Sequence, residues 1–337
     1  MPFTLSHAAA VLPGIRRDGT GRGPLLASAL VAGSFAPDMT YFAATAVPAA
    51  MSFGDVTHSL PGLVTVDVLI TAALVGLWLL MREPLVALVP RRRQARFHGF
   101  VRGEDWSGTQ LPALAWRFFL SAAIGSCTHV FWDSFTHLDR WGMKVLPVLG
   151  EIVAGFPMYL YAQYGGSAVA LVVIVWFTVS ALRRRPDGPA PVCVPLLDAR
   201  GRWAAWGLLA LCVLAGVVHR CVRWYAAQTV PLKPLDFVPT ACFGAGAGLA
   251  VGLVLYALAV RLWPRRAEHR DSAATAGDLR SPAGRPQSPD GSGPLSPDGS
   301  GPRPPDGSGP QAPDGTTRPP DGRGLPVRAG QRGRSGG

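Results

Sequence analysis

Apolar residues in this chain gather in long runs that reach or approach the length of a membrane span. Four such runs cover residues 60–81, 166–182, 203–222 and 238–263. A helix of roughly 20 residues crosses the hydrocarbon core of a bilayer. A fifth run, residues 112–132, is less apolar and contains small residues that allow close packing against neighbouring helices. The pattern predicts an all-α, polytopic transmembrane helical bundle of five to six spans.

The sixth candidate span is less regular. Residues 25–47 are apolar, but the pair Pro37-Asp38 interrupts them. Proline removes a backbone donor and clashes with the preceding helical turn. We therefore expect this segment to form a broken or partly immersed helix.

The hydrophobic pattern stops near the C-terminus. From residue 267 onward apolar side chains almost vanish, and Pro-Asp-Gly recurs at positions 289, 297, 305, 313 and 320. Such a segment cannot bury enough apolar surface to offset the entropy of ordering, and its repeat has no hydrophobic face to stack. We predict an integral membrane helical domain over residues 1–266 and a disordered Pro/Gly/Asp-rich tail over residues 267–337.

Positive charge sets the expected orientation. The chain has a formal net charge of +11, and its Lys and Arg residues lie beside apolar runs without interleaved exposed aromatic residues. This arrangement indicates a bilayer as partner and not nucleic acid. Six Lys or Arg residues fall within residues 82–111 and five within residues 183–202. We expect both loops and the tail to be cytoplasmic in a multi-pass protein of the inner (plasma) membrane.

Cysteine chemistry is not indicated. The five cysteines are scattered and form no Cys-x-x-Cys pair, so neither a disulfide framework nor a thiolate zinc site is expected. The first apolar stretch, residues 3–12, is short and lacks the basic lead of a signal peptide. Candidate chemistry rests on histidine and aspartate.

Three metal-capable residues follow one another at a spacing of four near the end of the fifth run. They are His129, Asp133 and His137. On a helix this spacing directs all three side chains into one sector, and ionisable residues in membrane-like segments are usually functional. His129 and Asp133, about 6 Å apart along the axis, suit one shared ion. His137, about 12 Å from His129, needs a second ion, a substrate contact or a break in the helix.

Three further polar residues lie in apolar surroundings in the first part of the chain. They are His7, Asp38 and His58. Each alone is more simply, or equally well, explained by a helix end or a turn. Ser59 is expected to cap the next helix, with Pro61 in its first turn, which places His58 near a positive helix end that favours the neutral ring. Asp67 is expected either to join the site or to make a structural polar contact.

The remaining histidines are expected to lie outside this set. His98 falls in a basic loop and His269 in the tail, so both are predicted to be solvated. His219, with Arg220 and Arg223, is typical of a membrane-boundary cluster. A second interpretation makes that cluster a contact for an anionic headgroup.

Five motifs in order carry a resemblance to a known family. They are Met1-Pro-Phe-Thr-Leu-Ser-His-Ala-Ala, Gly33-Ser-Phe-Ala-Pro-Asp, Thr57-His-Ser-Leu-Pro-Gly, the segment from Gly125 to His137, and Gln163-Tyr-Gly-Gly-Ser. Together they resemble a bacterial membrane family, the domain-of-unknown-function family 4184, over roughly residues 1–260. That family has no established activity to carry over.

The same order of motifs is similar to the membrane-bound metal-dependent hydrolases. Their pattern of an N-terminal His, a Pro-Asp pair, a Thr-His-Ser and a Gly-x-x-x-His-x-x-x-Asp falls here on His7, Asp38, His58, His129 and Asp133. Two departures matter. Asp-Met-Thr replaces an Asp-x-Asp after the proline, and Gly-Asp-Val replaces a His-Arg-Gly before Thr-His-Ser, so two potential ligands or phosphate contacts are missing.

These patterns predict a membrane-embedded hydrolase that acts on a lipid or phosphoester through a divalent ion. Zinc is the expected ion, with manganese or iron as alternatives. The metal ligands are expected among His7, Asp38, His58, His129, Asp133 and His137. Whichever of Asp38 and Asp133 is not bound to metal is the expected general base.

Non-catalytic functions are the alternative. Intramembrane carboxylates and histidines also serve structural metal sites and ion or solute passage. Internal duplication, typical of transporters, is not apparent because the motifs lie in the first half of the chain. A third hypothesis is a scaffold whose tail recruits protein partners.

Overall fold

The protein is described by a computed structural model over residues 3–138, 140–189, 191–229 and 236–262. Four described helices are long and apolar enough to cross a membrane: α6 (Val66–Ala87), α10 (Met158–Arg183), α11 (Ala199–Ala226) and α12 (Phe237–Leu262). These four helices indicate a membrane protein, and the expected all-α class is confirmed. The predicted tail, residues 267–337, lies outside the described residues.

The fifth predicted span is the 26-residue helix α8 (Leu111–Thr136). It is long enough to cross a bilayer but, by length and composition together, it is not among the four apolar candidates. Shorter elements join the long helices. They are η1 (Thr4–His7), α1 (Ala8–Val11), η2 (Leu12–Gly14), α2 (Ala27–Gly33), η3 (Ala36–Asp38), α3 (Met39–Ala43), η4 (Pro48–Met51), α4 (Gly54–Thr57), α5 (Leu60–Val64), η5 (Arg91–Arg93), α7 (Gln94–Arg102), α9 (Trp141–Val145), η6 (Pro147–Gly150), β1 (Ile152–Val153) and β2 (Phe156–Pro157).

The sixth candidate span is broken, as expected. Within residues 25–47 the chain forms α2, η3 and α3 in succession, with Pro37 at the start of η3. The seven residues of α2 extend only about 10 Å at 1.5 Å per residue. This segment therefore does not cross a bilayer as one continuous helix.

Helices α2 and α8 run parallel and in close contact. The Leu26 amide donates to Ser121 Oγ (2.8 Å) at one end, and Ser126 Oγ donates to the Gly33 carbonyl (3.1 Å) near the other. A Cβ added at Gly125 would lie 2.5 Å from the Leu30 carbonyl oxygen, which is closer than packed atoms allow. The small residues of α8 thus let the two backbones touch, as the sequence predicts.

The N-terminal segment packs along α10. Ser6 Oγ lies 3.3 Å from Ser167 Oγ in the first half of α10, and Arg17 Nη1 donates to Ser180 Oγ (2.6 Å) near its end. Arg185 just beyond α10 donates to the Asp18 carbonyl (2.6 Å). Residues 6–18 therefore extend along α10 from Ser167 to its end.

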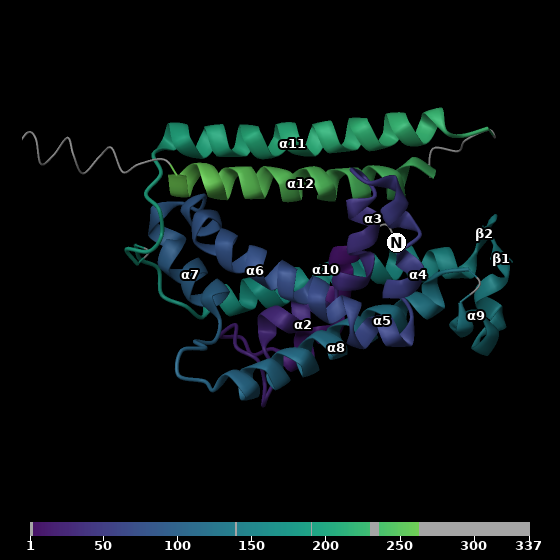
Figure 1. Cartoon of the computed structure of the whole chain (residues 1–337), viewed down its shortest axis with the longest axis horizontal. Helices are drawn as coiled ribbons and strands as arrows, with labels where there is room; N and C mark the ends of the chain where they lie inside the picture. Colours follow the sequence, from purple (N-terminus) through teal and green to yellow (C-terminus); the bar gives the residue numbers. More distant parts are fainter. Residues whose placement is uncertain (1–2, 139, 190, 230–235, 263–337) are drawn as a thin grey trace, which may run out of the picture. The chain divides into compact units, whose positions relative to one another are not determined.

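The two Arg-rich loops lie against each other. The Ala95 amide donates to the Gly188 carbonyl (3.0 Å), the Gly188 amide donates to the Arg92 carbonyl (2.8 Å), and Arg96 pairs with Asp187 (3.1 Å). Residues 82–111 and 183–202 therefore share one end of the helical unit, near α7 in Figure 1. His98 was expected to be solvated there, and that expectation is wrong. It lies on α7 and is buried, with its Nε2 3.5 Å from Cys193 Sγ.

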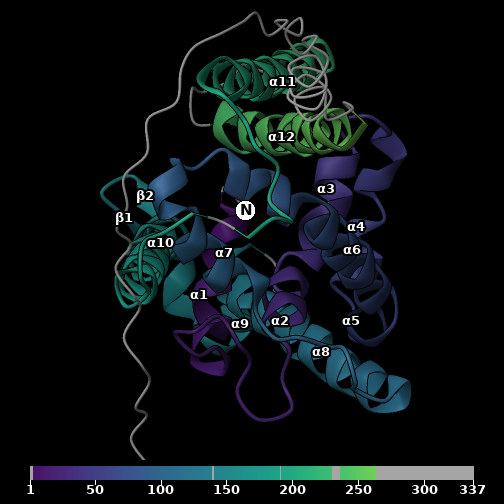
Figure 2. The ribbon, with the colours of Figure 1, turned by 90° about the vertical axis from the view of Figure 1, so that its left-hand side faces the viewer.

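Helices α11 and α12 form a pair that packs on the other helices through α12 (Figures 1 and 2). Leu88, Ala205, Leu209 and Tyr256 make a buried apolar cluster between this pair and the end of α6. Tyr256 Oη donates to the Pro84 carbonyl (2.7 Å) in the last turn of α6. Pro84 has no amide hydrogen to donate to the Leu80 carbonyl, which accepts from Arg261 Nη2 on α12 instead (2.7 Å). At its other end α12 contacts α3, next to the site described below.

Candidate metal centre

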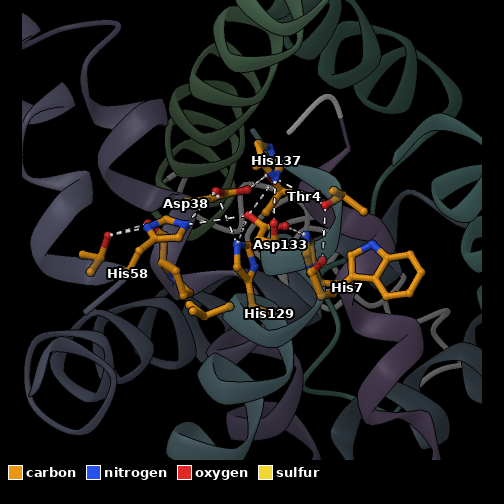
Figure 3. A network of polar contacts seen from close by, with 12 residues as sticks. Thr4, His7, Asp38, His58, His129, Asp133 and His137 are labelled. Carbon is orange, nitrogen blue, oxygen red and sulfur yellow. Dashed lines mark hydrogen bonds and ion pairs between the residues drawn. The ribbon is translucent and has the colours of Figure 1, made fainter. Parts of the chain in front are cut away.

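Four elements, η1, η3, α4 and α8, bring the predicted site residues together (Figure 3). His7 ends η1, Asp38 ends η3, and His58 directly follows α4. His129 and Asp133 lie one turn apart on α8. Asp38 is the N-terminal cap residue of α3, but its side chain makes no capping bond and is directed into the cluster instead.

Four of these residues offer ligand atoms within reach of a common point. One atom each of Asp38, His58, His129 and Asp133 lies within 4.8 Å of the other three. The expected convergence of His58, His129 and Asp133 is confirmed. Ligation of a metal by them stays a prediction.

The spacing of these atoms matches a single divalent ion. His129 Nε2 lies 3.5 Å from Asp38 Oδ1 and 3.4 Å from Asp133 Oδ2. His58 Nε2 lies 3.9 and 3.8 Å from the same two oxygens. Around a tetrahedral ion with bonds of about 2.1 Å, neighbouring ligand atoms are about 3.4 Å apart. The cluster is thus close to, and slightly wider than, a four-ligand site.

Backbone carbonyls fix which histidine nitrogen faces the carboxylates. His129 Nδ1 lies 2.8 Å from the Ser34 carbonyl oxygen, and His58 Nδ1 lies 2.9 Å from the Gly54 carbonyl oxygen. A carbonyl only accepts, so each Nδ1 carries hydrogen and each neutral ring presents the Nε2 lone pair to Asp38 and Asp133. This is the arrangement by which proteins orient metal-binding histidines.

The interior of the cluster is not satisfied by hydrogen bonds. Within the described chain Asp38 Oδ1, His129 Nε2 and Asp133 Oδ1 are buried without a hydrogen-bond partner. A protonated imidazole would approach a carboxylate to about 2.7–2.9 Å, well below the 3.4–3.9 Å found here. With both rings neutral, lone pairs face lone pairs across this gap and repel each other. A proton or a metal cation between them removes that repulsion.

His7 joins the cluster from the far side of Asp133. Its ring stacks on His129 with centroids 3.7 Å apart, and its Nε2 lies 3.5 Å from Asp133 Oδ1. Asp133 Oδ2 faces His129 and His58, so the two oxygens of one carboxylate serve opposite sides. Burial lowers the pKa of His7 to about 3, which keeps its ring neutral. His7 lies beside the four-residue group and not within it.

His137 reaches the site because the helix breaks. Helix α8 ends at Thr136, and His137 has extended backbone angles (φ −130°, ψ 142°). Its Nδ1 lies 3.8 Å from Asp133 Oδ2, and its Nε2 lies 3.1 Å from Gln163 Nε2 on α10. Of the three arrangements expected for His137, the structure has the helix break, and the residue remains outside the four-residue group.

Two polar partners were not assigned roles from the sequence. Thr4 Oγ1 donates to Asp38 Oδ2 (2.5 Å), and Gln163 contacts His137. Both lie inside the motifs that carry the family resemblance, but neither is a usual metal ligand or catalytic base. Only their position within those motifs could have pointed to them.

The cluster opens into a cavity of about 230 Å³. Its wall includes Asp38, His58, Asp133, His137 and Arg140. Carboxylates, imidazoles and one guanidinium therefore meet the same space. The Arg140 side chain gives that space a positive charge directly beside the candidate ligands.

Asp67 was expected either to join the site or to make a structural polar contact. It lies on α6, is fully buried, and neither carboxylate oxygen has a hydrogen-bond partner among the described residues. It does not belong to the four-residue group. The structure therefore places it outside the candidate ligands and gives it no polar contact through its side chain.

A family model described as Domain of unknown function (DUF4184) matches residues 1–258. The chain belongs to the DUF4184 family. The match covers all six candidate ligands and ends before the predicted tail. No curated protein and no solved structure matches the chain. The similarity to metal-dependent hydrolases remains a resemblance of motifs, while membership of the DUF4184 family agrees with the order of motifs in the sequence.

Proposed function

We propose that this protein is a membrane-embedded, metal-dependent hydrolase that acts on a lipid or phosphoester. One observation supports this most strongly: the lone pairs of two oriented histidines and two aspartates converge in a buried cluster. Asp38, His58, His129 and Asp133 are the candidate ligands, with His7 beside them. Three of the four bound to the ion would leave its fourth position to water. Zinc suits this mixture of imidazole and carboxylate, and manganese or iron are the alternatives.

The open side of the cluster favours catalysis over a structural role. Structural zinc sites are closed by four protein ligands, mostly cysteine and histidine, whereas catalytic sites keep a position for water or substrate. Here Asp38, His58 and Asp133 all line the cavity. When bound, a divalent ion lowers the pKa of water to about 7 and polarises a substrate oxygen.

The surrounding residues would position the reacting groups. Thr4 holds one oxygen of Asp38 and leaves the other directed at His129. Whichever of Asp38 and Asp133 is not engaged by the ion would accept a proton from water. Arg140 in the cavity wall would attract the negative charge of a phosphoester.

The expected orientation supports a site that opens toward the outer leaflet of the plasma membrane. The two Arg-rich loops lie at one end of the unit, and the site lies near α4 and α9 at the other. With the Arg-rich end cytoplasmic, lipid substrates of the outer leaflet would reach the cavity.

Metal content of the detergent-purified chain tests the proposal. Wild type should carry a divalent ion, and His129→Ala should lose at least about tenfold in affinity for it. His98→Gln is the matched control, because His98 is also buried but lies at the other end. Equal metal content in wild type and His129→Ala would contradict the metal site.

Activity separates a catalytic from a structural ion. Phosphate release from dioleoyl phosphatidic acid and from p-nitrophenyl phosphate should require both the metal and His129. Bound metal with no hydrolysis of either probe, or of other lipid esters, would contradict the hydrolase and favour the structural or ion-transport alternatives.

A further inference from the structure

A second pocket lies beside the candidate metal centre and carries positive charge. It has a volume of about 170 Å³, and its wall includes Thr45, Met51, Arg220, Arg223 and Trp224. Met51 also lines the metal-centre cavity, so the two pockets share a wall. Arg220 lies over the ring of Phe243, 5.8 Å from its centroid, and Phe243 also lines the metal-centre cavity.

The C-terminal end of α3 and Thr45 just after it hold both guanidinium groups in place. Arg220 Nη1 donates to the Tyr41 carbonyl (3.1 Å) and to Thr45 Oγ1 (3.2 Å), and Arg223 Nη1 lies 3.4 Å from the Thr45 carbonyl. The hydrogen bonds of these two side chains to the described residues use Nη1 alone. The remaining N–H donors of each guanidinium group are available to a ligand.

The charge of this pair is not neutralised by the described part of the chain. Neither Arg220 nor Arg223 forms an ion pair with a described residue. Some arginines at the opposite end do have partners, for example Arg117 with Glu104 (2.7 Å). Two adjacent arginines lacking a carboxylate partner are an arrangement suited to binding phosphate, which a guanidinium can contact with two donors at once.

The position of the pocket favours a lipid as the source of that phosphate. Arg220, Arg223 and Trp224 lie in the last two turns of α11, one of the four apolar helices. Arginine and tryptophan at the end of a span lie at the level of lipid headgroups. A headgroup there would have its phosphate at the arginines and a neighbouring group at the metal centre.

We infer that the pocket lined by Thr45, Arg220, Arg223 and Trp224 is a subsite for the phosphate of a membrane lipid whose headgroup extends into the metal-centre cavity. This inference rests on the proposed hydrolase function and narrows its substrate to phosphate-bearing lipids. A purely structural role for the arginines, as caps for the carbonyls after α3, is the alternative that the experiment must separate.

Binding of a non-hydrolysable lipid tests the subsite. The probe is the radiolabelled phosphonate analogue of dioleoyl phosphatidylglycerol, whose headgroup continues beyond the phosphate, bound to the full chain in mixed detergent micelles. Arg223→Gln and the double variant Arg220→Gln/Arg223→Gln should bind it at least about tenfold more weakly. Arg202→Gln is the matched control, because Arg202 lies at the other end of α11 and likewise donates to a carbonyl, that of Leu197 (2.9 Å).

The outcomes separate the possible explanations. If the double variant does not fold, Arg223→Gln alone decides, since Arg223 is exposed and makes only one long contact. Wild-type affinity in Arg223→Gln, or equal loss in Arg202→Gln, would overturn the subsite. Equal binding of dioleoylglycerol, which has no phosphate, or displacement of the probe by inorganic phosphate at similar concentration, would overturn its assignment to a phosphate-bearing lipid with further headgroup contacts.

Metal content keeps this test distinct from that of the hydrolase. Arg223→Gln should retain the wild-type amount of divalent ion, because Arg223 contacts none of the candidate ligands. Binding that depends on Arg223 in a wild-type chain that carries no metal would support the subsite and overturn only the hydrolase.

Discussion

The imidazole of His129 on α8 is bonded through Nδ1 to the carbonyl oxygen of Ser34, the residue that follows α2, at 2.8 Å. This contact connects helix packing to the candidate metal centre. The parallel approach of α2 and α8 sets where Ser34 lies, and Ser34 in turn sets which nitrogen of His129 faces the carboxylates. The same approach brings Asp38, four residues after Ser34, to His129 Nε2 at 3.5 Å.

Because α2 and α8 approach each other so closely at Gly125, we expect one added methyl group there to destabilise the protein. Gly125→Ala would place a Cβ 2.5 Å from the Leu30 carbonyl oxygen, so α2 and α8 must separate. We expect a loss of about 1–3 kcal/mol in stability, seen as a lower Tm, together with weaker metal binding. Gly76→Ala is the control, because nothing lies within 4 Å of its Cβ and alanine favours a helix. Similar Tm values for both variants would contradict the close packing.

The hydrogen bond from Thr4 predicts an effect on the metal centre without loss of a ligand. Thr4→Val keeps the shape of the side chain but removes the donor to Asp38 Oδ2, so the carboxylate is no longer oriented. We expect metal affinity to fall by about tenfold or more, as for other residues that orient ligands. Competition with a metallochromic chelator measures it. Thr4→Ser, which keeps the hydroxyl, should restore affinity, and wild-type affinity in Thr4→Val would show that Asp38 needs no such support.

Sequence spacing located the part of the site that depends on one element. His129 and Asp133 are four residues apart on a helix, so their shared direction follows from helix geometry alone. The contact of His7 with Asp133 and that of Thr4 with Asp38 depend on how η1 packs against α8 and η3, which no local pattern encodes. For His137 the spacing of four residues does not give the side-chain direction, because α8 ends at Thr136 and His137 is extended.

The basic segment illustrates a second limit. His98 lies among several arginines in sequence, and that composition indicates a solvated loop. The segment instead forms α7, which buries His98 and Gln94 while its arginines remain at the surface or half-buried. Which face of a short, charged helix is buried cannot be read from its composition, because that depends on the residues that pack against it.

We predict that the protein becomes more stable when the charge of Asp67 is removed. Its carboxylate is fully buried on α6 with neither oxygen hydrogen-bonded to a described residue, and burying such a group is costly. Asp67→Asn should therefore raise Tm and leave the metal content unchanged. Asp55→Asn, at an exposed position, is the control and should leave both unchanged. Loss of metal in Asp67→Asn would instead make Asp67 part of the site.

Metal removal should destabilise only a chain that can hold the ion. A ligand that binds the folded state stabilises it by about 2.7 kcal/mol at 100 times its dissociation constant. EDTA should therefore lower the Tm of wild type and of the control His98→Gln. It should have little effect on Asp38→Asn or His129→Ala. An equal shift in all four proteins would show that the chelator acts elsewhere.

Sidedness determines which lipids can reach the site, and the N-terminal segment bears on it. If residues 25–47 crossed the membrane completely, His7 would begin on the side opposite the other ligands. Instead the chain passes from His7 at the site along α10 to Arg17, and then through the short helix α2 back to Asp38. The two segments run in opposite directions, so His7 and Asp38 lie at the same end.

The Arg-rich loops at the far end should consequently be cytoplasmic and the site should face outward. Single cysteines at Arg91 and Lys144, both exposed, would report this in a background without the native cysteines. We expect a membrane-impermeant maleimide applied to intact cells to label position 144, and to label position 91 only after the cells are opened. Labelling of position 91 from outside, with position 144 protected, would reverse the orientation and place the site at the cytoplasmic leaflet.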